Sequence, residues 1–271
     1  MRRLACVTLV RVTHTYGSYL RIQELLSLQA PESKPVEHDE TLFIIIHQVY
    51  ELWFKQQLHE ADRLAALLTE GDLPRASRTM RRMLTILKTM VAQIDVLETM
   101  SPIDFLSFRS FLSSASGFQS WQFRAFEFAF GNKNAKALER YPEDSAERAL
   151  LSKRLAAPTI WDAFLRCIAK CGHAVPAEVL ARDVTADITE SAALQDTLIA
   201  IYRAQRPEAS LCELLVDFDE GVQEWRYRHV KMVERTIGFK QGTGGSPGAA
   251  YLRTTLFKPF FPDLWAIRSR L

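Results

Sequence analysis

Long stretches of this sequence repeat apolar residues every three or four positions, with almost no glycine or proline inside them. The 11 glycines and 11 prolines of the 271 residues are sparse and clustered. The stretch that follows Pro35 keeps helical spacing until Gly71 and Pro74, which are typical of a helix end. Further helices are predicted at about 76–100, 118–130, 143–155, 159–171, 192–204 and 211–238. The one strand signal is a weak alternation of apolar and polar residues at 5–12. We therefore predict an all-α bundle of long antiparallel helices.

No break in composition divides the chain. The one glycine-rich stretch, 242–248, does not resemble a flexible interdomain linker, and no repeat with a period of about 20 to 50 residues occurs. We therefore predict a single domain over 1–271.

Charge and cysteine content exclude several classes of protein. The net charge is only +2 and no basic block occurs, so a nucleic-acid partner is not expected. No apolar run reaches the roughly 18 residues that a membrane span needs, so no membrane partner is expected either. The four cysteines, Cys6, Cys167, Cys171 and Cys212, are typical of reduced thiols, and we expect a cytoplasmic protein.

Two histidines stand out within the expected helices. His47 follows the apolar run 43–46, where burial favours a neutral imidazole, and His229 follows 225–228, which contains two arginines able to neutralise an anionic ligand. A buried histidine on each of two helices is one way for an all-α protein to hold a haem or a metal. Taken alone, a core histidine at 47 and a solvated basic face at 229 are the commoner arrangements.

Other candidate motifs are incomplete. Cys167, Cys171 and His173 lack a fourth ligand, so core packing of the cysteines is favoured over a zinc site. Paired Glu-x-x-His motifs are absent, which argues against a di-iron site. No Cys-x-x-Cys-His run occurs, so a haem would be held non-covalently. The stretch 242–248 suits a flexible lid or a surface loop better than a phosphate loop. Arg109, flanked by aromatic residues, suits a carboxylate ligand, although an ordinary salt bridge is at least as consistent.

Several separated segments, taken together, resemble the tryptophan 2,3-dioxygenase family. They are Tyr16–Leu20, His38–Lys55, Phe108-Arg109, Ser116–Ser120 with Gln122–Arg124, Trp225–Ser246 and Phe260–Trp265. The resemblance runs in order from about Tyr16 to Leu271. It implies an all-helical homotetramer with a non-covalent haem b and with dioxygen as co-substrate. The implied reaction inserts both oxygen atoms across the indole C2–C3 bond of L-tryptophan and gives N-formyl-L-kynurenine.

The resemblance also implies roles for individual residues. His229 matches the proximal histidine that ligates the haem iron, and His47 matches the distal histidine that faces the indole nitrogen. Arg109 matches the arginine that binds the amino-acid carboxylate, and Thr243 matches the threonine near the ammonium group. A hydrogen bond from the indole nitrogen is enough for His47 to position the substrate, so no obligatory base is assigned.

Three further groups complete the implied site. They are an aromatic wall of Phe43 and Phe105, a distal haem face of Ala115, Ser116 and Gly117, and the N-terminal residues Tyr16, Tyr19 and Leu20, which family members lend to a neighbouring subunit. Some members have tyrosine where this chain has Phe105, so a hydroxyl contact is missing here.

Departures from the family pattern keep two other functions open. The N-terminal arm, 1–15, is atypically apolar and contains Cys6, the stretch 203–210 is short, and Pro247 replaces a serine. One alternative is a mono-oxygenase that converts tryptophan, or a methylated tryptophan, into an oxindole in secondary metabolism. The other is a haem-binding sensor without turnover, although a sensor has no need of Arg109 and Thr243.

Overall fold

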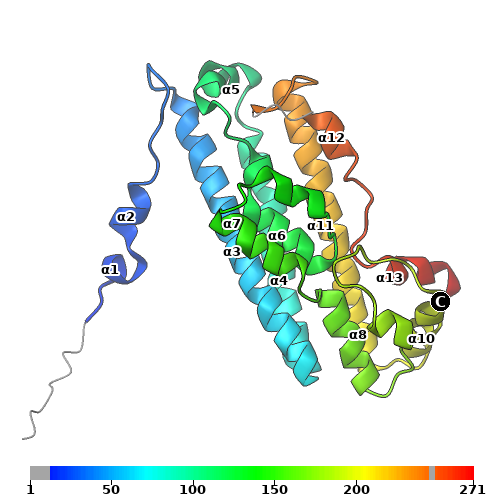
Figure 1. The fold of residues 1–271 in the computed structure, drawn as a ribbon. Helices are drawn as coiled ribbons and strands as arrows, with labels where there is room; N and C mark the ends of the chain where they lie inside the picture. Colours follow the sequence, from blue (N-terminus) through cyan, green and yellow to red (C-terminus); the bar gives the residue numbers. More distant parts are fainter. Residues whose placement is uncertain (1–12, 244–247) are drawn as a thin grey trace, which may run out of the picture.

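The computed structural model describes residues 13–243 and 248–271, and all the regular elements in this part of the chain are helices (Figure 1). In chain order they are α1 Tyr16–Leu20, α2 Ile22–Leu26, α3 His38–Glu70, α4 Leu73–Leu97, α5 Pro102–Phe108, η1 Arg109–Leu112, η2 Gly117–Gln119, α6 Trp121–Phe130, η3 Ala135–Arg140, α7 Ala146–Leu155, α8 Ile160–Lys170, α9 Ala177–Leu180, α10 Ala192–Arg203, α11 Pro207–Ile237, α12 Ala249–Arg253, α13 Pro262–Ala266 and η5 Ile267–Arg270. The all-α prediction is confirmed for these residues. The weak strand signal at 5–12, Cys6 and Pro247 lie outside them.

Helices α3 and α4 form an antiparallel hairpin. Gly71, with φ of 86°, ends α3 in the left-handed conformation that glycine adopts readily. Asp72 then caps α4 by accepting a hydrogen bond from the Arg75 amide at 3.0 Å. Further along the hairpin, Gln57 donates to the Met83 carbonyl at 2.9 Å. The connection is therefore tight enough to hold the two long helices side by side.

Helix α11 packs along α4 and completes the group of three long helices (Figure 1). Gly221 lies against Leu87, where an added Cβ would come within 2.9 Å of the leucine side chain. Two turns further on, Arg228 pairs with Asp95. Positions on both helices increase together, so α11 runs in the same direction as α4 and opposite to α3. The predicted antiparallel arrangement therefore holds for α3 and α4, but it is wrong for α4 and α11, which are parallel.

The remaining helices cover this group and enclose the main apolar core. The largest fully buried side chains of this core include Trp161, Phe128, Phe130, Phe164, Phe218 and Phe261. Asp219 on α11 holds the C-terminal segment against this core. Its carboxylate accepts hydrogen bonds from the backbone amides of Phe260 and Phe261 at 2.9 and 3.1 Å. A smaller apolar cluster, with Ile46, Leu97, Met100, Phe105 and Phe108, lies where α3, α4 and α5 meet. The candidate site adjoins this smaller cluster.

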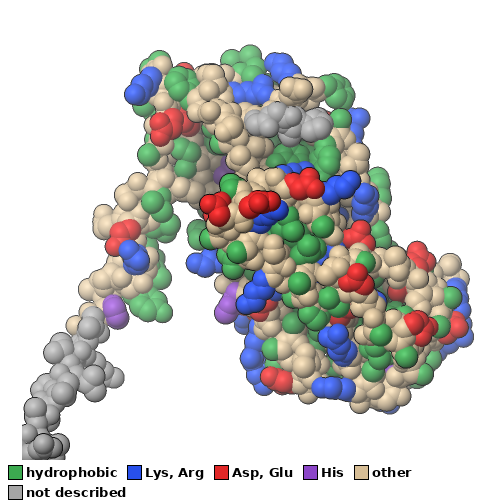
Figure 2. Space-filling model, viewed as in Figure 1, with side chains coloured by type: hydrophobic (Ala, Val, Ile, Leu, Met, Phe, Trp, Pro, Cys, Tyr) green, Lys and Arg blue, Asp and Glu red, His purple; other side chains and the backbone are tan. Residues whose placement is uncertain are grey.

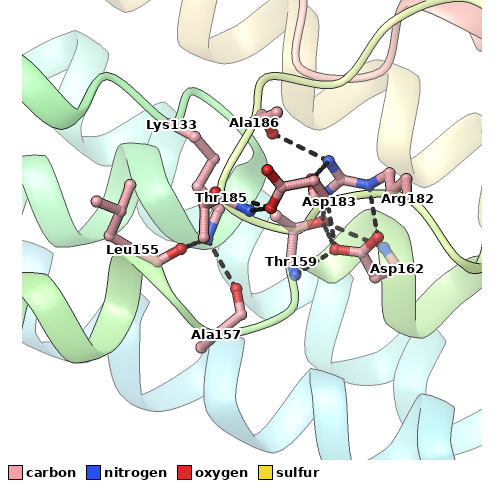
Figure 3. A network of polar contacts seen from close by, with 9 residues as sticks. All are labelled: Lys133, Leu155, Ala157, Thr159, Asp162, Arg182, Asp183, Thr185 and Ala186. Atoms are coloured by element: carbon pink, nitrogen blue, oxygen red, sulfur yellow. Dashed lines mark hydrogen bonds and ion pairs between the residues drawn. The ribbon is translucent and has the colours of Figure 1, made fainter.

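A polar network fixes the connection between α7 and α8 (Figure 3). The Lys133 ammonium donates to the carbonyls of Arg154, Leu155 and Ala157 at 2.8–3.0 Å, which satisfies the carbonyl end of α7. At the start of α8, Asp162 accepts from Thr159 and from the Arg182 guanidinium. The network therefore caps two helix ends, the C-terminus of α7 and the N-terminus of α8, with buried charged groups.

The cysteines follow the sequence prediction only in part. Cys167 and Cys212 are buried in the main core, as expected. Cys171 is exposed because it lies at the C-cap of α8, where the helix ends, so packing does not explain it. In the described residues, no helix combines the length and the apolar character that crossing a membrane requires.

Helices α1 and α2 extend away from the bundle (Figure 1). Their apolar side chains are largely uncovered: Tyr16 is 77% exposed, Tyr19 72% and Leu26 67%. Figure 2 shows hydrophobic side chains along the extended segment. A segment of this kind leaves apolar surface that its own chain does not bury.

Candidate active site

A pocket opens where α3, α4, α5 and the last turns of α11 meet. It encloses about 860 Å³ of space, including the part open to solvent, which is within the usual range for a small-molecule site. Eight of the site residues expected from the sequence line it: Phe43, His47, Phe105, Arg109, Ser116, Gly117, His229 and Thr243. Segments up to 200 positions apart in the chain are therefore brought together as expected.

His47 lies on α3 with its ring in a fixed orientation. Its Nδ1 is 2.7 Å from the Phe43 carbonyl, so Nδ1 carries the hydrogen and donates it one turn back along the helix. Burial lowers the pKa of His47 and outweighs the opposing effect of this hydrogen bond. The neutral ring therefore keeps a lone pair on Nε2, which can accept a hydrogen bond from an N–H group in the pocket.

His229 lies on α11 and lines the same pocket. Burial, reinforced by the nearby His47, lowers its pKa to about 4. The indole of Trp225 stacks on its ring, with centroids 5.3 Å apart and planes inclined by 3°. Within the described part of the chain, no hydrogen bond involves the imidazole of His229. A neutral imidazole of this kind has a lone pair free for a metal.

The two arginines beside His229 are engaged elsewhere. Arg226 is buried and pairs with Glu127 at 3.2 Å. Arg228 pairs with Asp95 and with Glu98. From the sequence, these arginines were considered as a solvated basic face or as a pair that neutralises an anionic ligand. Neither description fits them, because both guanidinium groups already have carboxylate partners. The partners come from distant segments, which the local sequence does not reveal.

Arg109 begins η1, directly after the buried Phe105 and Phe108 of α5. Its guanidinium donates to the carbonyl of Gln241, at the start of the glycine-rich stretch. No carboxylate in 13–243 or 248–271 forms a salt bridge with it, so the salt-bridge alternative does not hold there. The guanidinium has further donors available to a carboxylate in the pocket.

Aromatic rings form one wall of the pocket. The Phe43 ring lies 4.0 Å from the His47 ring and 5.8 Å from the Phe105 ring, centroid to centroid. Phe108 supports both phenylalanines from the core side, at 5.6 and 5.5 Å. This wall suits a flat apolar group next to His47.

Ser116 and Gly117 line the pocket beside η2, and Ala115 does not. Ala115 is exposed at the turn that precedes them. An added Cβ on Gly117 would meet no atom within 4 Å, so the backbone here borders open space. Tyr16, Tyr19 and Leu20, on α1, do not line the pocket of their own chain.

The donor set fits a haem. Among the described residues, no three His, Cys, Asp or Glu side chains gather as ligands of an isolated metal ion, so iron at His229 needs ligands from outside the protein. A second hollow of about 570 Å³ adjoins the pocket and shares His47, Leu97, Gly117 and His229 with it. Its other lining residues are mostly apolar, and the buried Nε1 of Trp225 there has no hydrogen-bond partner. A porphyrin supplies the missing ligands and suits this apolar space.

Several lining residues were not singled out from the sequence. Met232, Val233 and Thr236 line the pocket because they follow His229 by three, four and seven positions on α11. Helical spacing from His229 is a signal that finds them. Leu97 and Met100, at the end of α4, depend on how α4 and α11 pack, and no local signal marks them.

In the part of the chain that the structure describes, which is helical, two neutral histidines and an arginine meet in one pocket, an arrangement suited to a haem beside a small acid. A comparison with known families then identifies the group. The chain belongs to the tryptophan 2,3-dioxygenase family, whose model matches residues 5–157 and 189–271. The unmatched residues, 158–188, contain α8 and α9.

Individual relatives match along nearly the whole chain. A tryptophan 2,3-dioxygenase of Herpetosiphon aurantiacus is 58% identical, over 95% of this chain and 98% of the relative. One from Anaeromyxobacter sp. strain K is 54% identical, over 95% and 96% of the two chains. One from Kineococcus radiotolerans is 48% identical, over 95% and 91%.

Proposed function

We propose that this chain is a haem-dependent dioxygenase that opens the indole C2–C3 bond of L-tryptophan with dioxygen and gives N-formyl-L-kynurenine. The observation that carries the proposal is the meeting of His229, His47 and Arg109 in one pocket. The names of the similar proteins, all tryptophan 2,3-dioxygenases, support this reaction over mono-oxygenation.

His229 is the residue that would hold the haem iron. Its burial keeps the imidazole neutral, and its lone pair is not used by a described residue. Haem b would supply the iron that activates dioxygen for the oxidation of the indole. The chain itself would supply His229 as a ligand of the iron and an apolar enclosure.

Arg109, Thr243 and His47 would orient the substrate. Charged hydrogen bonds from Arg109 to the amino-acid carboxylate contribute about 1.5–3 kcal/mol. Thr243 lines the same pocket, two positions after the Gln241 carbonyl that Arg109 contacts, and offers a hydroxyl to the ammonium group. The Nε2 lone pair of His47 accepts from the indole N–H, while Phe43 and Phe105 border the ring. Orientation of this kind is a large part of catalysis.

The glycine-rich stretch would limit the access of water. The bond from Arg109 to the Gln241 carbonyl ties the carboxylate-binding residue to the start of this stretch. A carboxylate bound by Arg109 would therefore lie next to Gly242 and Thr243. Closure of a loop over a bound substrate excludes water from the reaction.

The assembly is proposed to be a homotetramer in which each N-terminal segment reaches the site of a neighbour. The exposed Tyr16, Tyr19 and Leu20 support this arrangement, because their own chain leaves them uncovered. The free thiols of Cys167, Cys171 and Cys212 are consistent with a cytoplasmic location.

The proposal is tested by following oxygen consumption by the haem-loaded, reduced protein. L-Tryptophan should stimulate oxygen uptake, while the D-enantiomer and indole without the amino-acid group should do so much less. A haem-loaded protein with no tryptophan-dependent uptake would instead fit the sensor function.

A further inference from the structure

We propose that Trp225 is a positioning residue for His229, because its indole fixes the rotation of the imidazole plane. The inference rests on the proposed function, since it takes His229 as the haem ligand. It goes further by assigning a task to Trp225, which does not line the pocket that contains Arg109 and Thr243.

The stacking geometry is the first observation. Trp225 and His229 lie one turn apart on α11, and helical residues four positions apart face the same side. Their rings are 5.3 Å apart between centroids and inclined by only 3°, which is an offset stack. Rotation of the imidazole about its bond to Cβ would break this stack.

The indole of Trp225 is itself held from three sides. The rings of Tyr50, Phe54 and Phe123 lie 6.2, 6.0 and 5.2 Å from it, centroid to centroid. The Tyr50 hydroxyl donates to the Met90 carbonyl on α4 at 2.7 Å, which fixes that ring as well. The surface against which His229 stacks is therefore rigid, with contributions from α3, α4 and α6.

The hydrogen bonds provide the second observation. A metal-ligating histidine usually donates its other N–H to a carbonyl or carboxylate, and this bond sets the plane of the ring. His47 makes such a bond, to the Phe43 carbonyl. His229 makes none with any residue in 13–243 or 248–271. The stack with Trp225 is thus the restraint that the described residues provide.

The orientation of the imidazole plane has a measurable consequence. It determines how the π orbital of the ligand overlaps the iron d orbitals, and hence how unpaired spin spreads over the macrocycle. In the ferric cyanide complex, the proton shifts of the four haem methyl groups report this distribution. They respond to rotation of the imidazole and much less to a general loss of stability.

The experiment compares wild type, Trp225→Phe and Trp225→Leu, all haem-loaded. Trp225→Phe keeps a flat ring and is the matched control, while Trp225→Leu keeps apolar bulk without a ring face. We expect Trp225→Phe to retain the wild-type order and spread of methyl shifts. We expect Trp225→Leu to change them and to release haem to apomyoglobin at least several-fold faster. Trp225→Met replaces Trp225→Leu if the latter does not fold.

Each other outcome overturns a stated part of the account. Wild-type methyl shifts in the leucine or methionine variant refute the positioning role of Trp225 while leaving the proposed function intact. Equal changes in the phenylalanine and leucine variants also refute it, because side-chain bulk rather than stacking would then matter. A wild-type protein that takes up no haem refutes the proposed function itself.

Discussion

At the residue scale, two imidazoles in one pocket have different surroundings and are therefore suited to different tasks. His47 donates from Nδ1 to its own helix and keeps Nε2 as an acceptor. His229 is neutral, packs on Trp225 and has no hydrogen-bond partner among the described residues. One ring is thereby suited to a substrate N–H and the other to a metal.

Replacement of His229, the residue proposed to hold the haem iron, tests its suitability for a metal. His229→Ala should lose most of the bound haem, because it removes the only protein ligand proposed for the iron. The ratio of haem absorbance to protein absorbance measures this loss. His59→Ala, at an exposed position of α3, is the control and should keep its haem. Full haem occupancy with a histidine-ligated spectrum in His229→Ala would contradict the assignment.

Arg109 gives a second prediction at this scale. Arg109→Ala should raise the apparent dissociation constant of L-tryptophan by about 10- to 150-fold, since charged hydrogen bonds are worth about 1.5–3 kcal/mol. Haem content should stay unchanged. Arg166→Ala, on the exposed side of α8, serves as the matched arginine control. Unaltered tryptophan affinity in Arg109→Ala would remove it from the carboxylate role.

At the element scale, the helices show which sequence signals sufficed and which did not. Apolar spacing located the long helices, but proline positions shifted their starts. Pro74 and Pro207 lie in the first turns of α4 and α11, where a missing amide hydrogen costs nothing, so these helices begin at Leu73 and Pro207 instead of 76 and 211. Ser120 caps α6, which therefore starts at Trp121 instead of 118.

The candidate site, like the helices, was predicted only in part from the sequence. Its residues were expected from motifs, and the structure brings most of them together. The stacking of Trp225 on His229 depends on side-chain rotamers, and the pairing of Arg226 with Glu127 spans 99 positions, so neither was accessible from sequence spacing. The roles assigned to the residues of the candidate site stay predictions.

The hydrogen bonds of Asp162 at the start of α8 predict how the stability of the fold depends on pH. Burial raises the pKa of Asp162, but hydrogen bonds from Arg182 and Thr159 outweigh it, so the net pKa lies below the usual 3.8. The ionised carboxylate therefore stabilises the fold above that value, and the effect is lost as pH falls through the lowered pKa. Asp162→Asn should reduce the free energy of unfolding by about 1–3 kcal/mol at neutral pH.

Denaturant titrations at several pH values check this expectation. The difference between wild type and Asp162→Asn should be constant above about pH 5 and shrink below about pH 4. Asp217→Asn, at an exposed position of α11, is the control and should show little difference. A difference for Asp162→Asn that stays constant down to pH 3 would show that the charge is not the stabilising feature.

At the scale of the whole molecule, the exposed N-terminal segment supports the proposed assembly of several chains. Tyr16 and Tyr19 are 77% and 72% exposed, and α1 makes no contribution to the pocket of its own chain. The single-domain organisation expected from the sequence stays a prediction, as does the tetramer.

Removal of the N-terminal segment tests the proposed assembly. A chain that begins at Ser27 should fold and bind haem, because α1 and α2 bury no residue. Its turnover of tryptophan should fall at least about tenfold, since the neighbour's site would lose its lining. Sedimentation should give a mass below that of four chains. A truncated tetramer with full activity would exclude this role for the segment.

The central claim is the reaction, and labelled dioxygen tests it most directly. The reduced, haem-loaded protein is given L-tryptophan and ¹⁸O₂, and the mass of the product is measured. We predict a ring-opened product that contains both labelled atoms. A product with one labelled atom and an intact ring would contradict dioxygenation and assign the protein to mono-oxygenation.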